Sequence, residues 1–140
     1  MAVASGLFAP EEASFVAEMM AEYFGGAADG GHRCLVDDTD GVQAVAYCQP
    51  KPAADRVWDL TMIAVRREHQ GRGLGTALLR HVEDGLRREG QRLLLVDTSG
   101  TAQFDRTRSF YLGCGYDQEA RVRDYWTDGD DLLIFRKALA

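Results

Sequence analysis

The segment from Val57 to Glu89 constrains this chain most, because a strand, a glycine turn and a helix follow one another in it directly. The apolar run VWDLTMIAV is typical of a buried strand, and the residues after Gly75 carry apolar side chains at helical spacing. Between them lies the turn Gln70-Gly71-Arg72-Gly73-Leu74-Gly75. Glycines permit a close approach to the backbone, and a helix N-terminus presents free N–H groups that bind phosphate. The segment therefore predicts a site for a phosphate-bearing ligand.

Two common phosphate-binding motifs fit this turn poorly. A P-loop requires Lys and then Ser or Thr after its last glycine, whereas Leu and Gly follow Gly73. The dinucleotide fingerprint G-x-G-x-x-G finds its first two glycines in Gly71 and Gly73, but Thr76 replaces the third. Asp97 ends the next apolar run, where a ribose-binding acid belongs, so a Rossmann unit that binds NAD stays an alternative.

Length and charge limit the classes of protein to which the chain can belong. It has 140 residues, enough for one domain, and we expect residues 1–140 to form it. No apolar run approaches a membrane span and the N-terminus lacks the features of a signal peptide, so we expect a cytoplasmic protein without a membrane partner. The formal net charge of −6, without a basic stripe, argues against nucleic acid as a partner.

The cysteines and histidines indicate neither a disulfide framework nor a metal site. Cys34, Cys48 and Cys114 are far apart and form no C-x-x-C pair, so we expect reduced thiols that pack as small hydrophobic side chains. The three histidines show no ligand spacing, so no metal is expected.

The remaining pattern predicts helices and strands in alternation. We expect helices from Pro10 to the glycines at 25 and 26, over 75–88 and over 104–112, and strands over 33–37, 42–49, 57–65, 92–97, within 116–125 and over 131–136. The strand over 57–65 is apolar along its length and is expected at the centre of the sheet, parallel to its successor. On the helix over 75–88, Glu83–Arg87 and Asp84–Arg88 are expected as exposed i,i+4 pairs.

Two motifs, together with this order of elements, resemble the GCN5-related N-acetyltransferase (GNAT) family. Gln70, Gly73 and Gly75 match the pattern Q/R-x-x-G-x-G/A of the family's acetyl-CoA pyrophosphate loop. The segment SFYLGCGY, which ends at Tyr116, is similar to the family's FY-x-x-x-GF segment, with Tyr for the final Phe. The resemblance covers nearly all of the chain, although the strand that normally precedes the first helix is poorly matched by residues 1–8.

This resemblance implies a fold and an activity. The fold is α/β, a single domain with a mixed central sheet flanked by helices, the acyl-CoA N-acyltransferase (GNAT-like) architecture. The activity is direct transfer, in a ternary complex, of the acetyl group of the co-substrate acetyl-CoA to a primary amine of a small molecule, amino acid or peptide. A non-catalytic acyl-CoA-binding sensor is the alternative, because the general base is open. Many members form homodimers, but no periodic feature here specifies such an interface.

The resemblance assigns the binding of acetyl-CoA to the glycine turn and to the end of the long strand. Backbone N–H groups of the turn would bind the pyrophosphate, and the strand would splay from its neighbour, bond the pantetheine arm and polarise the thioester carbonyl. Arg72 could contact phosphate or be a solvated loop residue, and Thr76 could donate its hydroxyl or only pack. The predicted acetyl-CoA-binding residues are Ile63, Ala64, Val65, Gln70, Gly71, Arg72, Gly73, Leu74, Gly75 and Thr76.

Tyr111 and Asp59 are the predicted catalytic residues. Tyr111 belongs to the FY segment, and its phenol, with a pKa of about 10, can serve as the general acid for a thiolate with a pKa of about 8.5. A structural tyrosine at the helix end is the alternative. Asp59 aligns with a glutamate base of some members and could act as base, bind the substrate ammonium or pair with an arginine. Trp58 and Cys114 are expected to be structural.

Overall fold

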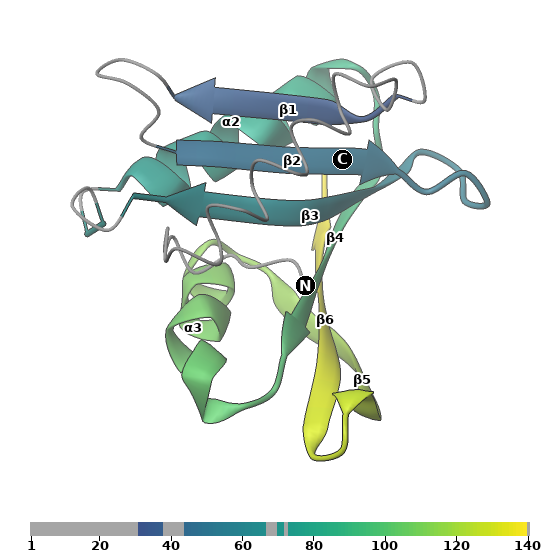
Figure 1. The fold of residues 1–140 in the computed structure, drawn as a ribbon. Helices are drawn as coiled ribbons and strands as arrows, with labels where there is room; N and C mark the ends of the chain where they lie inside the picture. Colours follow the sequence, from purple (N-terminus) through teal and green to yellow (C-terminus); the bar gives the residue numbers. More distant parts are fainter. Residues whose placement is uncertain (1–30, 38–43, 67–69, 72, 140) are drawn as a thin grey trace.

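The computed structural model describes residues 31–37, 44–66, 70, 71 and 73–139, and Figure 1 draws the remainder as a grey trace. The helix expected from Pro10, the turn expected at 38–41 and Arg72 lie outside the described residues. Each strand and helix expected within them is present, with small shifts at the ends. In chain order they are β1 (Arg33–Asp37), β2 (Ala44–Pro50), β3 (Val57–Val65), α2 (Leu74–Arg88), β4 (Leu93–Ser99), η3 (Ala102–Phe104), α3 (Asp105–Gly113), β5 (Asp117–Thr127) and β6 (Asp130–Ala138).

The strands form one mixed sheet of six in the order β1-β2-β3-β4-β6-β5. Every neighbouring pair is antiparallel except β3 and β4, which are parallel and are joined through α2. The structure confirms the mixed α/β sheet and the central place of β3. It also removes the Rossmann alternative, because a dinucleotide-binding sheet is mostly parallel and doubly wound.

The parallel pair at the centre of the sheet comes apart. Only Val57–Asp59 of β3 pair with β4, and they do so with Leu93–Leu95, although both strands continue well beyond. Figure 1 shows β4 leaving β3 and running down beside β6, with α3 in the angle between them. The splay that the resemblance implies is therefore present, and it begins at Asp59.

A β-bulge in β3 decides which side chains face the core. Tyr47 of β2 lies opposite Met62 and Cys48 lies opposite Leu60, so Thr61 is an extra residue on β3. Before the bulge the even-numbered Trp58 and Leu60 belong to the main hydrophobic cluster, and after it the odd-numbered residues do. The odd-numbered Asp59 therefore points to the opposite face of the sheet, because alternate residues of a strand face opposite sides.

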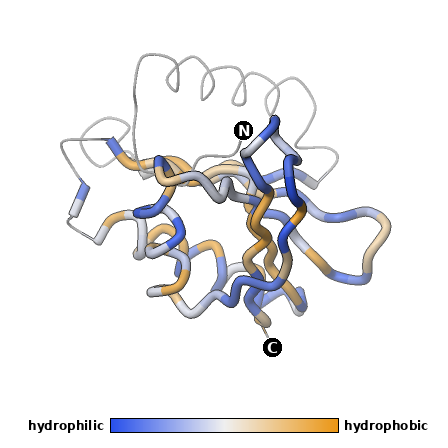
Figure 2. The backbone as a smooth tube through the Cα atoms, turned by 90° about the horizontal axis from the view of Figure 1, so that it is seen from below, coloured by the Kyte–Doolittle hydropathy of each residue, from blue (hydrophilic) through white to orange (hydrophobic). Residues whose placement is uncertain are grey.

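Helix α2 packs on β1, β2 and β3 through its apolar side. Leu79 and Leu86 are almost completely buried there, and full burial of a leucine stabilises a fold by about 1.5–3 kcal/mol. Figure 2 shows hydrophobic residues along the strands in the middle of the molecule. Trp58 is part of this core, as expected, and its indole N–H donates to Gln91 Oε1 at 2.9 Å. No helix among the described residues is long and apolar enough to cross a membrane.

The glycines of SFYLGCGY end helix α3 in a fixed geometry. Gly115 has a φ of +91°, which glycine adopts at little cost. The Gly115 N–H then donates to Leu112 O at 3.1 Å, and the Tyr116 N–H donates to Tyr111 O at 3.0 Å. This pair of bonds is a Schellman motif, which satisfies the last carbonyls of a helix. The motif fixes the backbone of Tyr111 through its own carbonyl.

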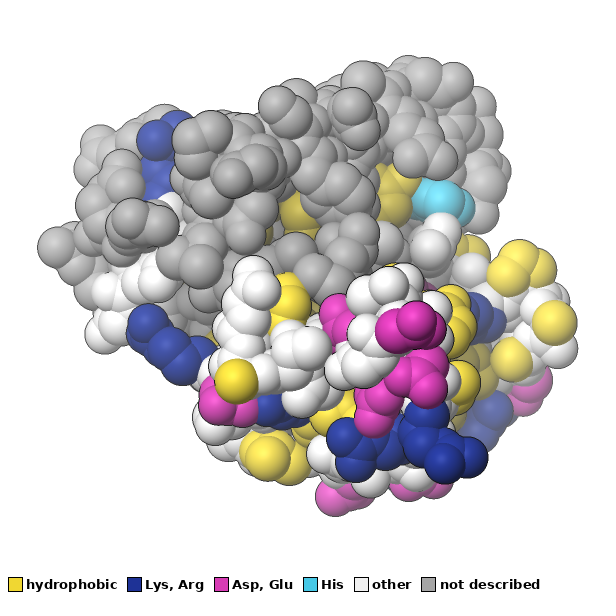
Figure 3. All heavy atoms as spheres, turned by 60° about the horizontal axis from the view of Figure 1, so that its bottom comes forward, with side chains coloured by type: hydrophobic (Ala, Val, Ile, Leu, Met, Phe, Trp, Pro, Cys, Tyr) yellow, Lys and Arg dark blue, Asp and Glu magenta, His cyan; other side chains and the backbone are white. Residues whose placement is uncertain are grey.

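The β5–β6 hairpin forms the outer edge of the sheet, and β5 is exposed along almost all of its length. One ion pair joins its strands: the Arg121 Nε–H donates to Asp131 Oδ2 at 2.7 Å, and the Asp124 backbone N–H donates to Asp131 Oδ1 at 2.9 Å. Figure 3 shows acidic and basic side chains side by side on this part of the surface. Such exposed pairs contribute about 0–1 kcal/mol each, so they form a solvated face.

Candidate active site

The glycine turn leaves the start of α2 open. Gly71 and Gly73 have φ values of +79° and +78°, and a Cβ on either would meet nothing within 4 Å. Gly73 is the N-cap residue and provides no side-chain cap, and no acidic side chain lies in the first turn of α2. The first N–H groups of α2 are thus available to an anion, which the positive end of the helix dipole favours.

The turn is held against the end of β3. Gln70 Nε2 donates to Val65 O at 3.3 Å, so the first residue of the glycine pattern is tied to the last residue of the strand. A Cβ on Gly75 would lie 3.4 Å from the ring of Phe110 and 3.5 Å from Val65, so α2, β3 and α3 meet at this glycine. The structure therefore brings the predicted residues Ile63, Ala64 and Val65 next to the described part of the turn. Leu74 is half-buried and Thr76 is exposed.

Tyr111 of α3 lies within the main hydrophobic core. Its side chain is 0% exposed, and its ring contacts the rings of Phe110, Tyr116 and Phe135. The Tyr111 hydroxyl nevertheless has no hydrogen-bond partner among the described residues. Burial, then the fields of Cys114 and Asp59, raise the pKa of this hydroxyl well above its ordinary value of 10, so it stays protonated at neutral pH.

Asp59 is the last residue of β3 that pairs with β4. It is 7% exposed, its Oδ2 accepts a hydrogen bond from Thr61 Oγ1 at 3.3 Å, and its Oδ1 has no partner among the described residues. Burial is the main cause that raises the pKa of Asp59 from its ordinary 3.8, and the charge of Asp97 adds to it, whereas Lys51 and the nearby side chains of Thr61 and Gln49 oppose the rise. The described residues contain no ion pair between Asp59 and an arginine, so that structural alternative has no support.

The sequence suggested Asp97 only as a ribose-binding acid of a Rossmann unit, whereas the structure places it near Asp59. Asp59 lies opposite Leu95, and Asp97 follows two residues later on β4, so it projects from the same face of the sheet as Asp59. Burial raises the pKa of Asp97, while the charge of Lys51 opposes this shift and also lowers the pKa of Asp59. A partial signal existed in the sequence, since Asp97, like Asp59, is an acid within a run that is predicted as an apolar strand.

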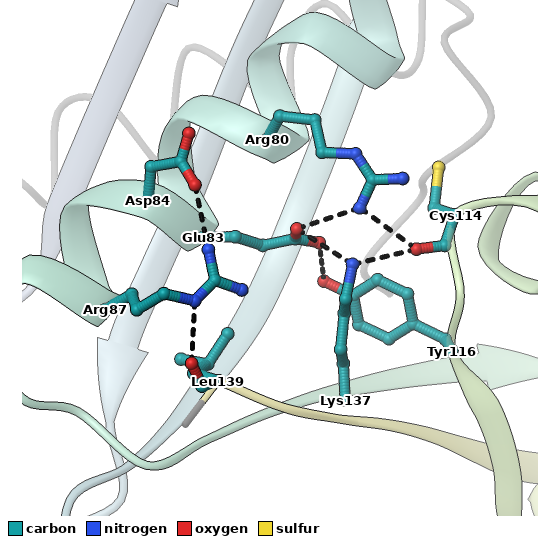
Figure 4. Close-up of polar contacts among 8 residues, drawn as sticks. All are labelled: Arg80, Glu83, Asp84, Arg87, Cys114, Tyr116, Lys137 and Leu139. Carbon is teal, nitrogen blue, oxygen red and sulfur yellow. Dashed lines mark hydrogen bonds and ion pairs between the residues drawn. The ribbon is translucent and has the colours of Figure 1, made fainter.

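Glu83 forms a second buried polar cluster, away from the splay. It is 1% exposed, and its carboxylate accepts hydrogen bonds from Tyr116 Oη at 2.7 Å, Lys137 Nζ at 3.0 Å and an Arg80 guanidinium N–H at 3.1 Å. Figure 4 shows these groups converging, with Cys114 O accepting from both cations. The expected pairing of Glu83 with Arg87 is wrong.

The other side of α2 differs from expectation as well. Arg87 binds Asp84 at 2.8 Å and donates to Leu139 O at 2.7 Å, so the expected pair of Asp84 with Arg88 is replaced by a pair with Arg87. Arg87 favours the pair with Asp84 because the Leu139 carbonyl gives its guanidinium a second acceptor. Sequence spacing alone contains no information on that contact.

The three cysteines are free thiols, and a cavity lined in part by Cys34 and Cys48 contains none of the predicted site residues. Cys48 and Cys114 are buried and all three thiols are free, and burial raises the pKa of Cys48 to about 12, which makes it a poor nucleophile. A cavity of about 280 Å³ lies between β1, β2 and α2, and none of the predicted site residues lines it. Among the described residues no group of three His, Cys, Asp or Glu side chains could hold a metal.

The open glycine turn at the start of α2 and the splayed β3–β4 pair together define the acyl-CoA N-acyltransferase architecture. The sequence profile described as Acetyltransferase (GNAT) family matches residues 3–116. The chain therefore belongs to the GNAT acetyltransferase family, as its two motifs predict.

Solved structures show the same fold. A GNAT-family protein from Desulfovibrio desulfuricans is 37% identical, with a TM-score of 0.86 over 98% of this chain and 87% of that one. The ribosomal-protein-S18-alanine N-acetyltransferase from Escherichia coli is 22% identical, with a TM-score of 0.67 over 78% and 70%. An aminoglycoside 6′-N-acetyltransferase complexed with coenzyme A is 14% identical, with a TM-score of 0.68 over 78% and 73%. No curated protein matches the sequence.

Proposed function

We propose that this protein is an N-acetyltransferase that transfers the acetyl group of acetyl-CoA to a primary amine, directly and within a ternary complex. One observation carries the proposal. Asp59 and Tyr111 are the two predicted catalytic residues, and the buried side-chain atoms without a hydrogen-bond partner in the described part of the chain belong to these same two residues. Such atoms are rare in folded proteins and cost about 1–3 kcal/mol each, which favours a role in binding or catalysis.

The residues around the splay fit acetyl-CoA. The open backbone at Gly71 and Gly73 and the uncapped start of α2 would hold the pyrophosphate. The edge of β3 beyond Asp59 has no β4 partner, so the backbone of Ile63 to Val65 would bond the pantetheine arm. Acetyl-CoA supplies a thioester, the activated form of the acetyl group. The aminoglycoside acetyltransferase with the same fold is complexed with coenzyme A, which agrees with this assignment.

The proton balance of the reaction indicates the roles of Asp59 and Tyr111. The amine nitrogen attacks the thioester carbonyl carbon, a C–N bond forms, the C–S bond breaks and the sulfur leaves as a thiolate. An acceptor that arrives as an ammonium ion loses two protons, of which one ends on the sulfur and one in solvent. The site therefore needs an acceptor for the ammonium proton and a donor for the thiolate.

Tyr111 is the donor in this scheme. Its raised pKa keeps the hydroxyl protonated, and the lack of another partner leaves it ready to donate to the sulfur. A thiol pKa of about 8.5 lies below that of the phenol, so complete proton transfer is uphill. The hydroxyl acts mainly by stabilising the developing negative charge through a hydrogen bond in a water-poor core.

Asp59 faces the acceptor side. Its raised pKa reduces the gap to an ammonium pKa of about 10.4, although the gap stays large. Asp59 therefore acts first as an anionic contact for the ammonium and then accepts one of its protons, which frees the nitrogen lone pair for attack. The second proton leaves the nitrogen once the C–N bond has formed.

The glycine turn allows a direct test with a matched control. Gly73→Val places a branched side chain at φ +78° on the expected path of the pyrophosphate, and should weaken acetyl-CoA binding at least tenfold in calorimetry. Gly85→Ala, in the interior of α2, should leave the affinity unchanged. Retained affinity in Gly73→Val would refute the assignment of the turn, and saturable binding without coenzyme A release across an amine panel would favour a sensor.

A further inference from the structure

We propose that Asp97 and Asp59 form one carboxylate pair that receives the acceptor as a cation, and that the acceptor class is therefore an amine without a neighbouring carboxylate. This inference rests on the proposed function and narrows its substrate. Primary amines without an adjacent acid group, such as diamines, amino-acid amides and peptide N-termini, belong to the class. Free amino acids do not.

The sheet places the two carboxylates together. Asp59 is at the last hydrogen-bonded step between β3 and β4, and Asp97 is two residues past its β4 neighbour Leu95, on the same face. Leu94 and Val96 point into the cluster under α2, which confirms that Leu95 and Asp97 face the other way. The pair therefore lies at the point where the strands separate, on the face away from α2.

Unsatisfied polar atoms show that this point is built to receive a ligand. Asp59 Oδ1 is buried without a partner, and Tyr111 Oη is completely buried without one. Tyr111 reaches this region from the core on the other side of the sheet, and the charge of Asp59 contributes to the raised pKa of its hydroxyl. A buried carboxylate oxygen and a buried phenol hydroxyl, one an acceptor and one a donor, thus belong to opposite sides of the sheet, close enough for the charge of Asp59 to act on the hydroxyl.

The charges around Asp59 and Asp97 favour a positively charged ligand. Asp59 and Asp97 raise the local negative potential, and the exposed Lys51 is the cation whose field reaches both. Asp97 makes no side-chain hydrogen bond or ion pair within the described part of the chain, so its carboxylate is not neutralised by a close partner. An ammonium ion satisfies both acids, whereas a carboxylate beside the amine would be repelled by them.

The pair also provides a means of removing the proton. Two neighbouring carboxylates share protons as a unit, because the charge of one raises the proton affinity of the other. Before the nitrogen can attack, the bound ammonium gives one proton to the pair, and this proton then passes to solvent through the half-buried Asp97. Asp59 is 7% exposed, so Asp97 is the member of the pair that has more contact with solvent.

Matched acceptors test the substrate class. Each amino-acid amide is compared with the free amino acid that has the same side chain, for example alaninamide with alanine and phenylalaninamide with phenylalanine. We expect kcat/KM for the amide to exceed that for the free acid by about tenfold or more. Asp97→Asn should reduce this ratio several-fold and raise KM for the amide, with acetyl-CoA affinity unchanged. Asp117→Asn, which removes one exposed charge on β5, should leave the ratio intact. A ratio near one, or a ratio that Asp97→Asn leaves unchanged, would overturn the proposal.

A titration of the carboxylates keeps the pair testable even if the proposed function fails. In protein labelled with carboxyl-¹³C aspartate, Asp59 and Asp97 should both titrate above the ordinary range, and Asp97→Asn should lower the pKa of Asp59. Alaninamide should shift both carboxyl signals more than alanine does. An unchanged Asp59 titration in Asp97→Asn would refute the pair. Absence of acetyl-CoA binding in calorimetry would refute the proposed function and leave this result intact.

Discussion

The Glu83 cluster and the Asp59–Tyr111 region are two buried polar sites in one core, and they differ in how their atoms are satisfied. Glu83 is bound by Tyr116, Lys137 and Arg80. Asp59 Oδ1 and Tyr111 Oη have no partner among the described residues. A fully bonded buried acid holds elements together, here α2 with the start of β5 and with β6, whereas an unpartnered one destabilises the free protein and leaves groups ready for a ligand.

The largest effect should come from breaking the satisfied cluster. Glu83→Ala leaves Lys137 without its carboxylate partner and Tyr116 Oη without an acceptor, so it should lower the free energy of unfolding by about 3–5 kcal/mol. Urea unfolding measures the change. Asp84→Ala, one residue later on the exposed side of α2, should change it by less than about 0.5 kcal/mol. A small loss in Glu83→Ala would show that the cluster does not hold these elements together.

Breaking the unsatisfied site should affect turnover and spare the fold. Tyr111→Phe removes only the unpartnered hydroxyl, so it should lower kcat about 100-fold, equivalent to about 2.7 kcal/mol, without loss of stability or acetyl-CoA affinity. Initial rates of coenzyme A release measure kcat. Tyr125→Phe, at an exposed tyrosine, is the matched control. Equal rates in the two variants would remove the donor role of Tyr111.

Asp59→Asn should act on stability in the direction opposite to Glu83→Ala. A carboxyl whose pKa is raised by folding stabilises fully below its unfolded pKa and loses that contribution as the pH rises through the folded value. Asp59, raised from 3.8, therefore costs stability at neutral pH. Asp59→Asn should increase the free energy of unfolding by about 1 kcal/mol at pH 8.

The pH dependence is the sharper part of that experiment. The difference between Asp59→Asn and the parent should shrink as the pH falls through the raised pKa of Asp59, because the folded carboxyl is then protonated and neutral like the amide. Chemical unfolding across this range measures it. A variant that is less stable than the parent at pH 8 would place Asp59 with Glu83 as a structural acid.

Two glycines of one helix provide the smallest effects, again of opposite sign. Gly73→Ala forces alanine to a φ of +78° and should destabilise by about 1 kcal/mol. Gly85→Ala, inside α2 with only Arg88 within 4 Å of the new Cβ, should stabilise by about 0.5–1 kcal/mol. Thermal unfolding of the two variants gives the comparison. Stabilisation by Gly73→Ala would mean that the turn does not require its left-handed conformation.

The sequence by itself determined the elements and the family, and it supplied Asp59 and Tyr111 as candidate site residues. Periodicity predicts β3 and α2 because burial repeats with the pitch of each element, and the glycines at 73 and 115 mark conformations that other residues rarely adopt. The motif around Tyr111 identified a residue whose unusual hydroxyl environment the structure then revealed. Glu83 was missed although it follows Leu79 by four residues and precedes Leu86 by three, the spacing of a buried face.

Only the tertiary structure decided which polar groups meet. Lys137 reaches Glu83 from 54 residues away, and Asp97 shares a face of the sheet with Asp59 because the two parallel strands pair in register up to Leu95. A local pattern records which side of an element is buried, but it carries no information on what lies opposite. The satisfaction of a buried charge depends on that opposite partner, and this property distinguishes the structural acid Glu83 from Asp59, the acid that we propose to be functional.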